Sequence, residues 1–254
     1  MKTAVVANWV KLNTPLEGKL PWMYLDAIGL VTTGMGNRID PIGEALPLPW
    51  VNPDGSPATM QQISDAWYAV DAQRSDPKGE RQTSGLATKY GGAFAGVTSI
   101  RLTDAGIAQL VAGKLSANEV MLRTYYPGWD SFPADGQFAI SSMAWAMGAG
   151  FPKTFTSFTA KVNAGDWAGA IADADFQGIG VSQRIAMNKA MLANAAAVAA
   201  GQGDPEVLYW PGAPSGGGLW HKLAMLAIVG TGAGAAAAYW RPGLWKAVER
   251  WLLT

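Results

Sequence analysis

Two acids and a threonine lie close together near the N-terminus, within LEGKLPWMYLDAIGLVTTGMGN (residues 16–37). Glu17 and Asp26 are nine residues apart, and Thr32 follows Asp26 by six. Two carboxyl groups suit glycoside hydrolysis, in which one protonates the leaving oxygen and the other activates water or supports positive charge at the sugar carbon. The spacing alone favours a plainer alternative, a surface hairpin with two solvated acids in which Thr32 and Thr33 are merely good strand formers.

Three local elements are expected to position these side chains. Tyr24–Asp26 and Leu30–Thr33 flank a turn that contains Gly29, which predicts two short strands. Glu17 follows a short helical stretch, so that it, Asp26 and Thr32 are expected to meet in one cleft. Pro15 lies two residues before Glu17 and predicts that a regular helix does not run unbroken up to this acid.

Composition narrows the chemistry that the chain can perform. Of its 254 residues, 49% are hydrophobic and only 15% are charged, well below the roughly 25% usual for soluble domains. Its 19 basic and 19 acidic residues balance, which gives no electrostatic case for nucleic acid. The absence of cysteine excludes thiolate sites, and a lone His221 argues against a histidine-rich metal site and a Ser-His-Asp hydrolase. Catalysis must therefore rest on carboxylates, hydroxyls, Lys, Arg or Tyr, and we expect no cofactor and no metal.

Residues 1–200 are predicted to form one mainly helical α+β domain with a small N-terminal β-hairpin. Thr103-Asp104 is a plausible helix N-cap, and residues 134–147 read as a buried central helix because they are nearly uncharged. Proline-rich residues 41–60 are predicted to be loop. Apolar spacing predicts further helices at residues 62–74, 102–115, 166–174 and 182–200.

The composition changes beyond residue 200. Residues 201–218, GQGDPEVLYWPGAPSGGG, read as a flexible Gly/Pro-rich linker. Leu223–Trp240 then gives 18 residues without a charge, which as a helix would span roughly 27 Å, near the hydrocarbon thickness of a bilayer. Aromatic residues at both ends fit interfacial anchoring. We therefore predict a transmembrane helix and short basic tail over residues 219–254; the alternative is a buried Ala/Gly-rich core helix.

The charges around this segment predict its orientation. Arg241, Lys246 and Arg250 follow it, and only Lys222 and the normally neutral His221 lie immediately before it. The positive-inside rule places the C-terminus in the cytoplasm. Residues 1–200 would then lie on the periplasmic or wall side of the bacterial cytoplasmic membrane, anchored through residues 219–240.

Several residues of this stretch match a known motif in both residue type and spacing. The stretch resembles the active-site signature of the T-even phage lysozyme family, a glutamate followed by glycine, an aspartate, a threonine and Gly-x-Gly. The positions that fit without a gap are Glu17-Gly18, Asp26, Thr32, Gly34 and Gly36. Tyr24 and Gly29 also fall where that family has a tyrosine and a turn glycine.

Two downstream matches extend the resemblance over about residues 5–200. SMAWAMG (residues 142–148), with Trp145, resembles the central helix of the family. Asp166-Trp167 opens a predicted helix and is followed by Arg184, near the place where the family has an arginine that pairs with the catalytic glutamate. The chain departs from the family at Asn37, where a histidine is expected, and at Ala146, which replaces a polar cleft residue.

The resemblance implies a muramidase that cuts the β-1,4 bond from N-acetylmuramic acid to N-acetylglucosamine in peptidoglycan. Glu17 would be the general acid, Asp26 would position or activate water, and Thr32 would help to hold that water. Arg184 would orient Glu17; its alternative is an ordinary surface helix arginine. Implied substrate contacts are Tyr24, Gly34, Gly36, Trp145 and Arg184. Trp22, Trp50 and Trp129 are further sugar-stacking candidates, for which core packing is the favoured role.

The favoured interpretation is a phage endolysin tethered to the host membrane, with peptidoglycan and that membrane as its partners. We expect a monomer that binds no nucleic acid. The alternatives are a virion-associated or wall-binding protein with a degenerate site, a secreted toxin that degrades the wall, and a lytic transglycosylase. The last needs one acid and no water-activating aspartate.

Overall fold

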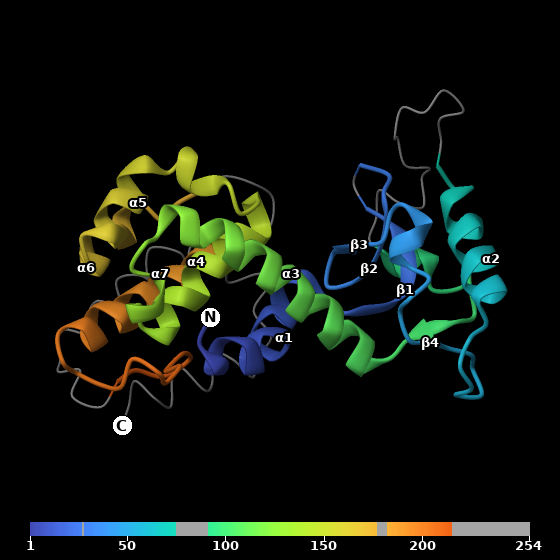
Figure 1. Ribbon diagram of the computed structural model, residues 1–254, viewed down its shortest axis with the longest axis horizontal. Coiled ribbons are helices and arrows are strands. Elements are labelled where there is room, and N and C mark those ends of the chain that lie inside the picture. The colour runs from blue at the N-terminus through green and yellow to red at the C-terminus, as the bar shows by residue number, and fades with distance from the viewer. Residues whose placement is uncertain (27, 75–90, 177–181, 215–254) are drawn as a thin grey trace. The chain divides into compact units, whose positions relative to one another are not determined.

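The structure is a computed structural model that describes residues 1–26, 28–74, 91–176 and 182–214 (Figure 1). It confirms an α+β fold that is mostly helical with a small antiparallel sheet. The chain divides into two compact units, one of residues Val10–Lys114 and one of Met1–Trp9 with the chain from Leu115 onward. The described α-helices are α1 (Thr3–Glu17), α2 (Met60–Asp71), α3 (Asp104–Tyr125), α4 (Ala134–Met147), α5 (Thr156–Asn163), α6 (Trp167–Ala172) and α7 (Ser182–Ala199).

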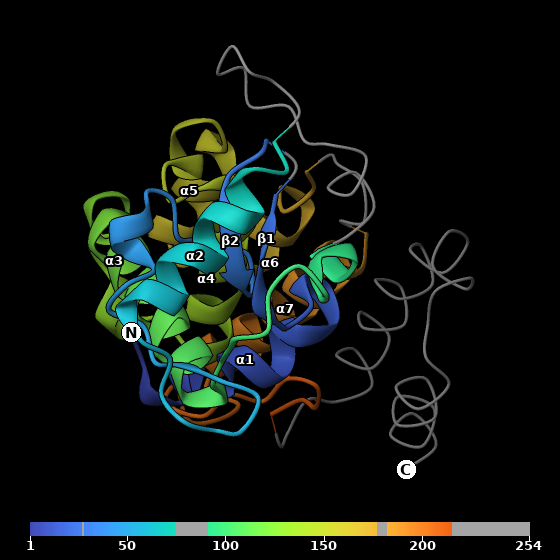
Figure 2. The same ribbon diagram turned by 90° about the vertical axis from the view of Figure 1, so that its right-hand side faces the viewer.

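A three-stranded antiparallel sheet organises the Val10–Lys114 unit. Its strands are β1 (Leu20–Leu25), β2 (Val31–Gly34) and β3 (Asn37–Arg38), hydrogen-bonded in that order. The predicted hairpin is thus confirmed, and a third short strand extends it. A bulge between Leu20 and Tyr24 shifts the register of β1 against β2. Helix α2 lies beside β1 and β2 (Figure 2), where the Trp67 indole N–H donates a hydrogen bond of 2.9 Å to the carbonyl of Ile39.

Helix α1 runs to Glu17 with Pro15 inside it, so the prediction of a broken helix is wrong. Proline removes one backbone donor and disfavours helical geometry at the residue before it. Two bonds hold the last turn together despite this: the Thr14 hydroxyl donates to the carbonyl of Val10, and the Gly18 N–H donates to that of Thr14 at 2.9 Å. Gly18 has a φ of 73°, the left-handed conformation that ends many helices. Glu17 is therefore the last helical residue.

The proline-rich stretch at residues 41–60 contains more order than the predicted loop. A 3-10 helix, η1, covers Ile42–Glu44, and β4 (Trp50–Val51) pairs antiparallel with β5 (Arg101–Leu102). Trp50 is 2% exposed and its indole N–H donates to the carbonyl of Ala45 at 2.9 Å, which gives this ring a packing role. Burial of one large aromatic side chain thus fixes a segment whose local sequence signals only turns.

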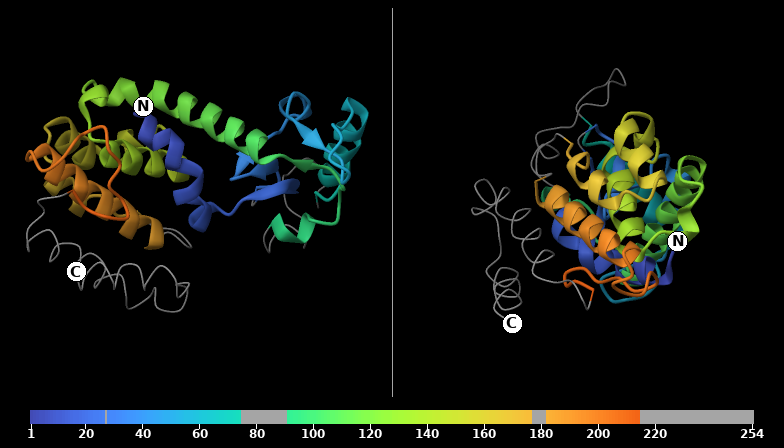
Figure 3. Two further views of the ribbon diagram at one scale, coloured as in Figure 1. Left: turned by 90° about the horizontal axis from the view of Figure 1, so that it is seen from below. Right: turned by 90° about the vertical axis from the view of Figure 1, so that its left-hand side faces the viewer.

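The helices predicted for residues 62–74, 166–174 and 182–200 are present with ends shifted by at most three residues, whereas the helix predicted for residues 102–115 continues to Tyr125 as α3. Thr103 caps α3 as expected, since its hydroxyl accepts a hydrogen bond of 3.0 Å from the Gly106 N–H. Helix α4 has the predicted bounds and is buried almost throughout. It lies beside α7 in the second unit (Figures 1 and 3), and Phe138 of α4 stacks on Trp9 with ring centroids 4.7 Å apart. Helix α5 is an element that the sequence reading did not include.

Residues 201–214 pack on the second unit, in contrast to the flexible linker predicted for residues 201–218. The carboxylate of Asp135 accepts hydrogen bonds from the backbone N–H groups of Tyr209 (2.7 Å) and Trp210 (3.0 Å) and from Asn194 Nδ2 (2.8 Å). The Ala134 N–H donates to the carbonyl of Pro205 at 2.9 Å. A buried acceptor far away in sequence therefore gives order to a stretch whose composition is that of a linker.

No helix in the described ranges is long and apolar enough to cross a membrane. The predicted span at Leu223–Trp240, with the rest of residues 219–254, lies outside those ranges.

Candidate active site

The turn between β1 and β2 positions Asp26. Leu25 and Val31 form the pair next to the turn, after which the Asp26 N–H donates to the carbonyl of Leu30 and the Gly29 N–H donates to that of Asp26, both at 3.0 Å. Gly29 has a φ of 77°, which explains a glycine at this place in the turn. These two hydrogen bonds close the turn from β1 to β2, and Asp26 is the first residue of that turn.

The two carboxylate oxygens of Asp26 have different surroundings. Oδ1 accepts two backbone hydrogen bonds, from the N–H of Ile28 at 3.0 Å and from that of Leu30 at 2.9 Å. Oδ2 faces the hydroxyl of Thr32 at 3.5 Å. One oxygen therefore holds the turn, and the other is directed toward the neighbouring strand.

The two threonines of β2 have separate partners. The Thr32 hydroxyl lies 3.0 Å from the carbonyl of Leu30, in addition to its contact with Asp26. The Thr33 hydroxyl donates to the carbonyls of Trp22 (3.0 Å) and Leu20 (3.4 Å), within the bulge of β1. Thr32 is thus the threonine beside the acid, and Thr33 supports the bulge.

Glu17 reaches the same region from the end of α1. A Cβ atom placed on Gly36 would lie 4.0 Å from Glu17 Oε2, so this carboxylate lies beside the turn between β2 and β3. Gly34 and Gly36 both have positive φ angles, 64° and 75°. At Gly34 a Cβ would also come within 3.1 Å of Asn37 Oδ1, the atom that accepts the Met35 N–H. Asn37, which stands where the family has histidine, therefore closes this turn.

The charges of both acids influence the hydroxyl group of Tyr24. Burial raises the pKa of its hydroxyl, and the negative charges of Asp26 and then Glu17 raise it further, while a backbone hydrogen bond from Gly36 opposes the rise. The phenol consequently stays protonated throughout the physiological pH range. Tyr24 also lies directly opposite Thr32 across the strands. The structure thus brings together Glu17, Tyr24, Asp26, Thr32 and Gly36, with Gly34 in the adjoining turn.

The other two predicted site residues belong to the second unit. Trp145 is 6% exposed and lies 5.4 Å from Trp9 between ring centroids, which favours a packing role. Arg184 is also 6% exposed, so the surface-arginine alternative is wrong; its Nη1 donates to the hydroxyl of Ser142 at 3.0 Å. The predicted pairing of Arg184 with Glu17 would join the two units and stays a prediction.

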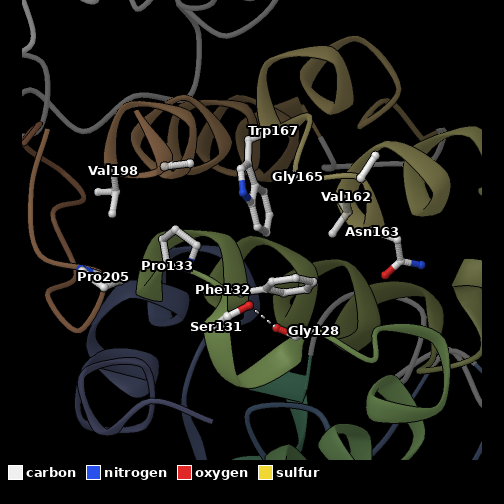
Figure 4. A pocket seen from close by; sticks show the side chains of 12 residues that line it. Gly128, Ser131, Phe132, Pro133, Val162, Asn163, Gly165, Trp167, Val198 and Pro205 are labelled. Atoms are coloured by element: carbon white, nitrogen blue, oxygen red, sulfur yellow. Dashed lines mark hydrogen bonds between the residues drawn. The ribbon is translucent and has the colours of Figure 1, made fainter. Parts of the chain in front are cut away.

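A hollow of about 410 Å³ in the second unit is separate from the acids (Figure 4). The rings of Phe132 and Trp167 line it in an edge-to-face arrangement, with centroids 4.9 Å apart. The Ser131 hydroxyl on its wall donates to the carbonyl of Gly128. None of the lining residues is ionisable, so this hollow offers neither an acid nor a base for catalysis.

Sequence reasoning missed one charged residue of the site region, Arg38. It lies directly opposite Thr32 on β3 and its side chain is exposed. The sequence indicates its position, because Arg38 follows Gly36 by two residues in a strand whose successive side chains point to opposite faces. For the described ranges, no group of three or more His, Cys, Asp or Glu residues is placed to hold a metal ion.

Comparisons with known proteins add no assignment to this geometry. No family model matches the chain, and a search of curated proteins found no significant relative. The likeness to the T-even phage lysozymes therefore rests on the motif residues themselves.

Proposed function

We propose that the chain is a peptidoglycan hydrolase, a muramidase, which cuts the β-1,4 bond from N-acetylmuramic acid to N-acetylglucosamine. The observation that carries this proposal is the arrangement around Tyr24. Asp26 Oδ2 lies 3.5 Å from the Thr32 hydroxyl, Thr32 pairs with Tyr24 across the strands, and Glu17 lies beside Gly36, so that the charges of both acids raise the pKa of the half-buried Tyr24 hydroxyl. Two carboxyl groups near one point are the apparatus that acid-assisted glycoside hydrolysis needs.

Each residue then has a definite task. Glu17 protonates the glycosidic oxygen as the bond to the anomeric carbon breaks, and Asp26 Oδ2 accepts a proton from the attacking water. The Thr32 hydroxyl lies 3.5 Å from that oxygen and holds the water in line. Inversion of configuration requires carboxyl groups roughly 6.5–9.5 Å apart, which leaves room for water between them. Arg184 orients Glu17 by a charge-assisted hydrogen bond in this proposal.

A specific observation favours a second candidate, a lytic transglycosylase. Asp26 Oδ1 accepts two backbone N–H groups, which is also what an aspartate with a purely turn-forming role does. In that case Glu17 acts alone, and the sugar's own hydroxyl attacks in place of water. The products separate the two reactions, since hydrolysis leaves reducing ends and transglycosylation leaves anhydro-sugars.

The experiment that tests the proposal is the Glu17→Gln substitution, assayed on purified peptidoglycan by mass analysis of released muropeptides. Loss of the general acid should lower the rate by at least about 10²-fold. Asp65→Asn, at an exposed acid on α2, is the matched control and should leave the rate unchanged. If Glu17→Gln keeps its thermal unfolding midpoint and still releases muropeptides at the parent rate, the acid assignment is wrong. A chain that releases no muropeptides even before substitution is a wall-binding protein.

We further propose that residues 219–240 tether the enzyme to the bacterial cytoplasmic membrane, with the active site on the wall side and the C-terminus in the cytoplasm. The support is the uncharged Leu223–Trp240 stretch and the basic residues after it. A tether also offsets the lack of net positive charge, because it holds the enzyme next to an anionic wall. Membrane fractionation tests it: the full chain should sediment with membranes, and a chain ending at Pro214 should not.

A further inference from the structure

A row of three side chains crosses the small sheet beside the acids. Tyr24 on β1 lies opposite Thr32 on β2, and Thr32 lies opposite Arg38 on β3. Residues directly opposite one another in antiparallel strands project from the same face. The guanidinium group of Arg38 therefore extends from the sheet face that also carries Tyr24 and Thr32.

Arg38 differs from other arginines of the chain in its surroundings. Arg74 pairs with Asp71, and Arg123 pairs with Glu119, so both serve the fold. The Arg38 side chain is exposed, and within the described ranges its guanidinium group forms neither a hydrogen bond nor an ion pair. A cation that the fold does not use, next to a candidate active site, is available for a ligand.

Arg38 also lines a pocket of about 490 Å³ on the Gly36 side of Glu17. The pocket includes Gly36, the glycine whose Cβ position is 4.0 Å from Glu17 Oε2. Its charged members are Arg38, Lys114 on α3 and Glu44 on η1. The complete lining is Gly36, Asn37, Arg38, Glu44, Leu48, Gln109, Leu110, Gly113 and Lys114.

We propose that this pocket is a carboxylate-binding subsite for the muramic acid part of the substrate, with Arg38 as its principal contact. This inference rests on the proposed function. Muramic acid carries a lactyl ether, and its carboxyl group is either free or joined to an acidic peptide stem. The free form presents the lactyl carboxylate beside the sugar ring, and the stem-bearing form presents the carboxylate of an acidic stem residue further along the peptide. A guanidinium fork binds a carboxylate through two parallel hydrogen bonds, which the exposed Arg38 side chain is free to offer.

Binding measured by calorimetry in a Glu17→Gln background tests this without any need for catalysis. Three ligands of similar length serve as probes: a muramic acid disaccharide with its peptide stem, the same disaccharide with a free lactyl carboxyl group, and an N-acetylglucosamine oligomer without a carboxylate. Arg38→Ala should weaken binding of carboxylate ligands about tenfold, the loss of one charge-assisted interaction at a partly solvated site. Arg38→Lys should recover part of that loss. Lys11→Gln, which removes an exposed cation outside the pocket, should leave all three affinities unchanged.

The pattern of losses decides the proposal. A loss for the free-lactyl ligand alone assigns the lactyl carboxylate, and a loss for the stem-bearing ligand alone assigns a carboxylate of the stem. A loss for both shows that the subsite accepts either group, and each of these three results supports the subsite. Equal losses for all three ligands, no loss for any, or a parent protein that binds none of them would overturn it. The proposed reaction fails separately, when Glu17→Gln leaves wall cleavage intact while Arg38→Ala still weakens carboxylate binding.

Discussion

The unequal surroundings of the two Asp26 oxygens make Asp26→Asn a clean test of the chemistry. Both turn hydrogen bonds, from the N–H groups of Ile28 and Leu30, end on Oδ1. An asparagine can place its single carbonyl oxygen there and keep both bonds. Its amide nitrogen then takes the place of Oδ2 beside Thr32, whose hydroxyl has the carbonyl of Leu30 as another partner at 3.0 Å. The substitution therefore removes the charge and the basic oxygen while the turn stays intact.

The expected magnitudes follow from this geometry. Asp26→Asn should change the free energy of unfolding by less than about 0.5 kcal/mol, because no buried donor loses its partner. Asp26→Ala should cost about 1–3 kcal/mol, chiefly from the N–H of Leu30, a residue only 5% exposed. Ile28 is 61% exposed, so its N–H can return to water. If Asp26 activates water, the Asn variant should nevertheless lose on the order of 10²–10⁴ in rate.

Thermal unfolding and reducing-end release from purified peptidoglycan, measured on the same preparations, check both parts. The hydrolytic mechanism requires a stable Asn variant that is nearly inactive. An Asn variant whose rate stays within about threefold of the parent refutes Asp26 as the base, and anhydro-sugars among its products would identify Glu17 as the only catalytic acid. An Asn variant as unstable as the Ala variant would instead refute the assignment of both turn bonds to one oxygen.

Two further substitutions address the strand pair and the buried carboxylate of the second unit. Thr32→Val should lower the rate of wall cleavage about tenfold with little loss of stability. Thr33→Val should instead lower stability by about 1 kcal/mol, because the partly buried carbonyls of Leu20 and Trp22 in the β1 bulge lose their donor. The reverse pattern in paired unfolding and activity assays would contradict the assignment. Burial raises the pKa of Asp135 from 3.8 to about 6, so the folded chain holds a proton that the unfolded chain releases near pH 4. As the pH rises from about 4 to about 6, the free energy of unfolding of the parent should therefore fall relative to that of Asp135→Asn, by up to about 3 kcal/mol. Denaturant titrations across that range check the sign, and a parent that gains stability relative to the variant would mean that its three hydrogen bonds outweigh the cost of burial.

The part of the site that could be predicted from sequence is the part built from local contacts. Asp26 and Thr32 are separated only by a turn, and the period of two in a strand decides which threonine faces the acid. Positive φ angles at Gly29, Gly34 and Gly36 are what glycines in such turns signal. Motif spacing is informative here because the backbone between these residues has few conformations available.

Two wrong predictions have different physical causes. Pro15 does not break α1, because the hydrogen bonds of its neighbours Thr14 and Gly18 offset the local penalty, which is about 3 kcal/mol for a fully interior proline. The linker-like stretch after residue 200 is ordered because Asp135 supplies a buried acceptor for its backbone. The sequence close to that stretch carries no sign of this distant acceptor.

Arg38 shows why a motif match leaves a candidate site incomplete. A signature records positions that share chemistry across a family, so it directs attention to Glu17, Asp26 and Thr32 and gives no role to a residue outside the pattern. Strand pairing supplies what the signature lacks, because it places Arg38 on the same face as Thr32. The signature thus predicts the reaction, while the register of β3 predicts which part of the substrate the protein recognises beside it. The two can fail independently, since removal of the Arg38 charge alters carboxylate binding without touching either acid.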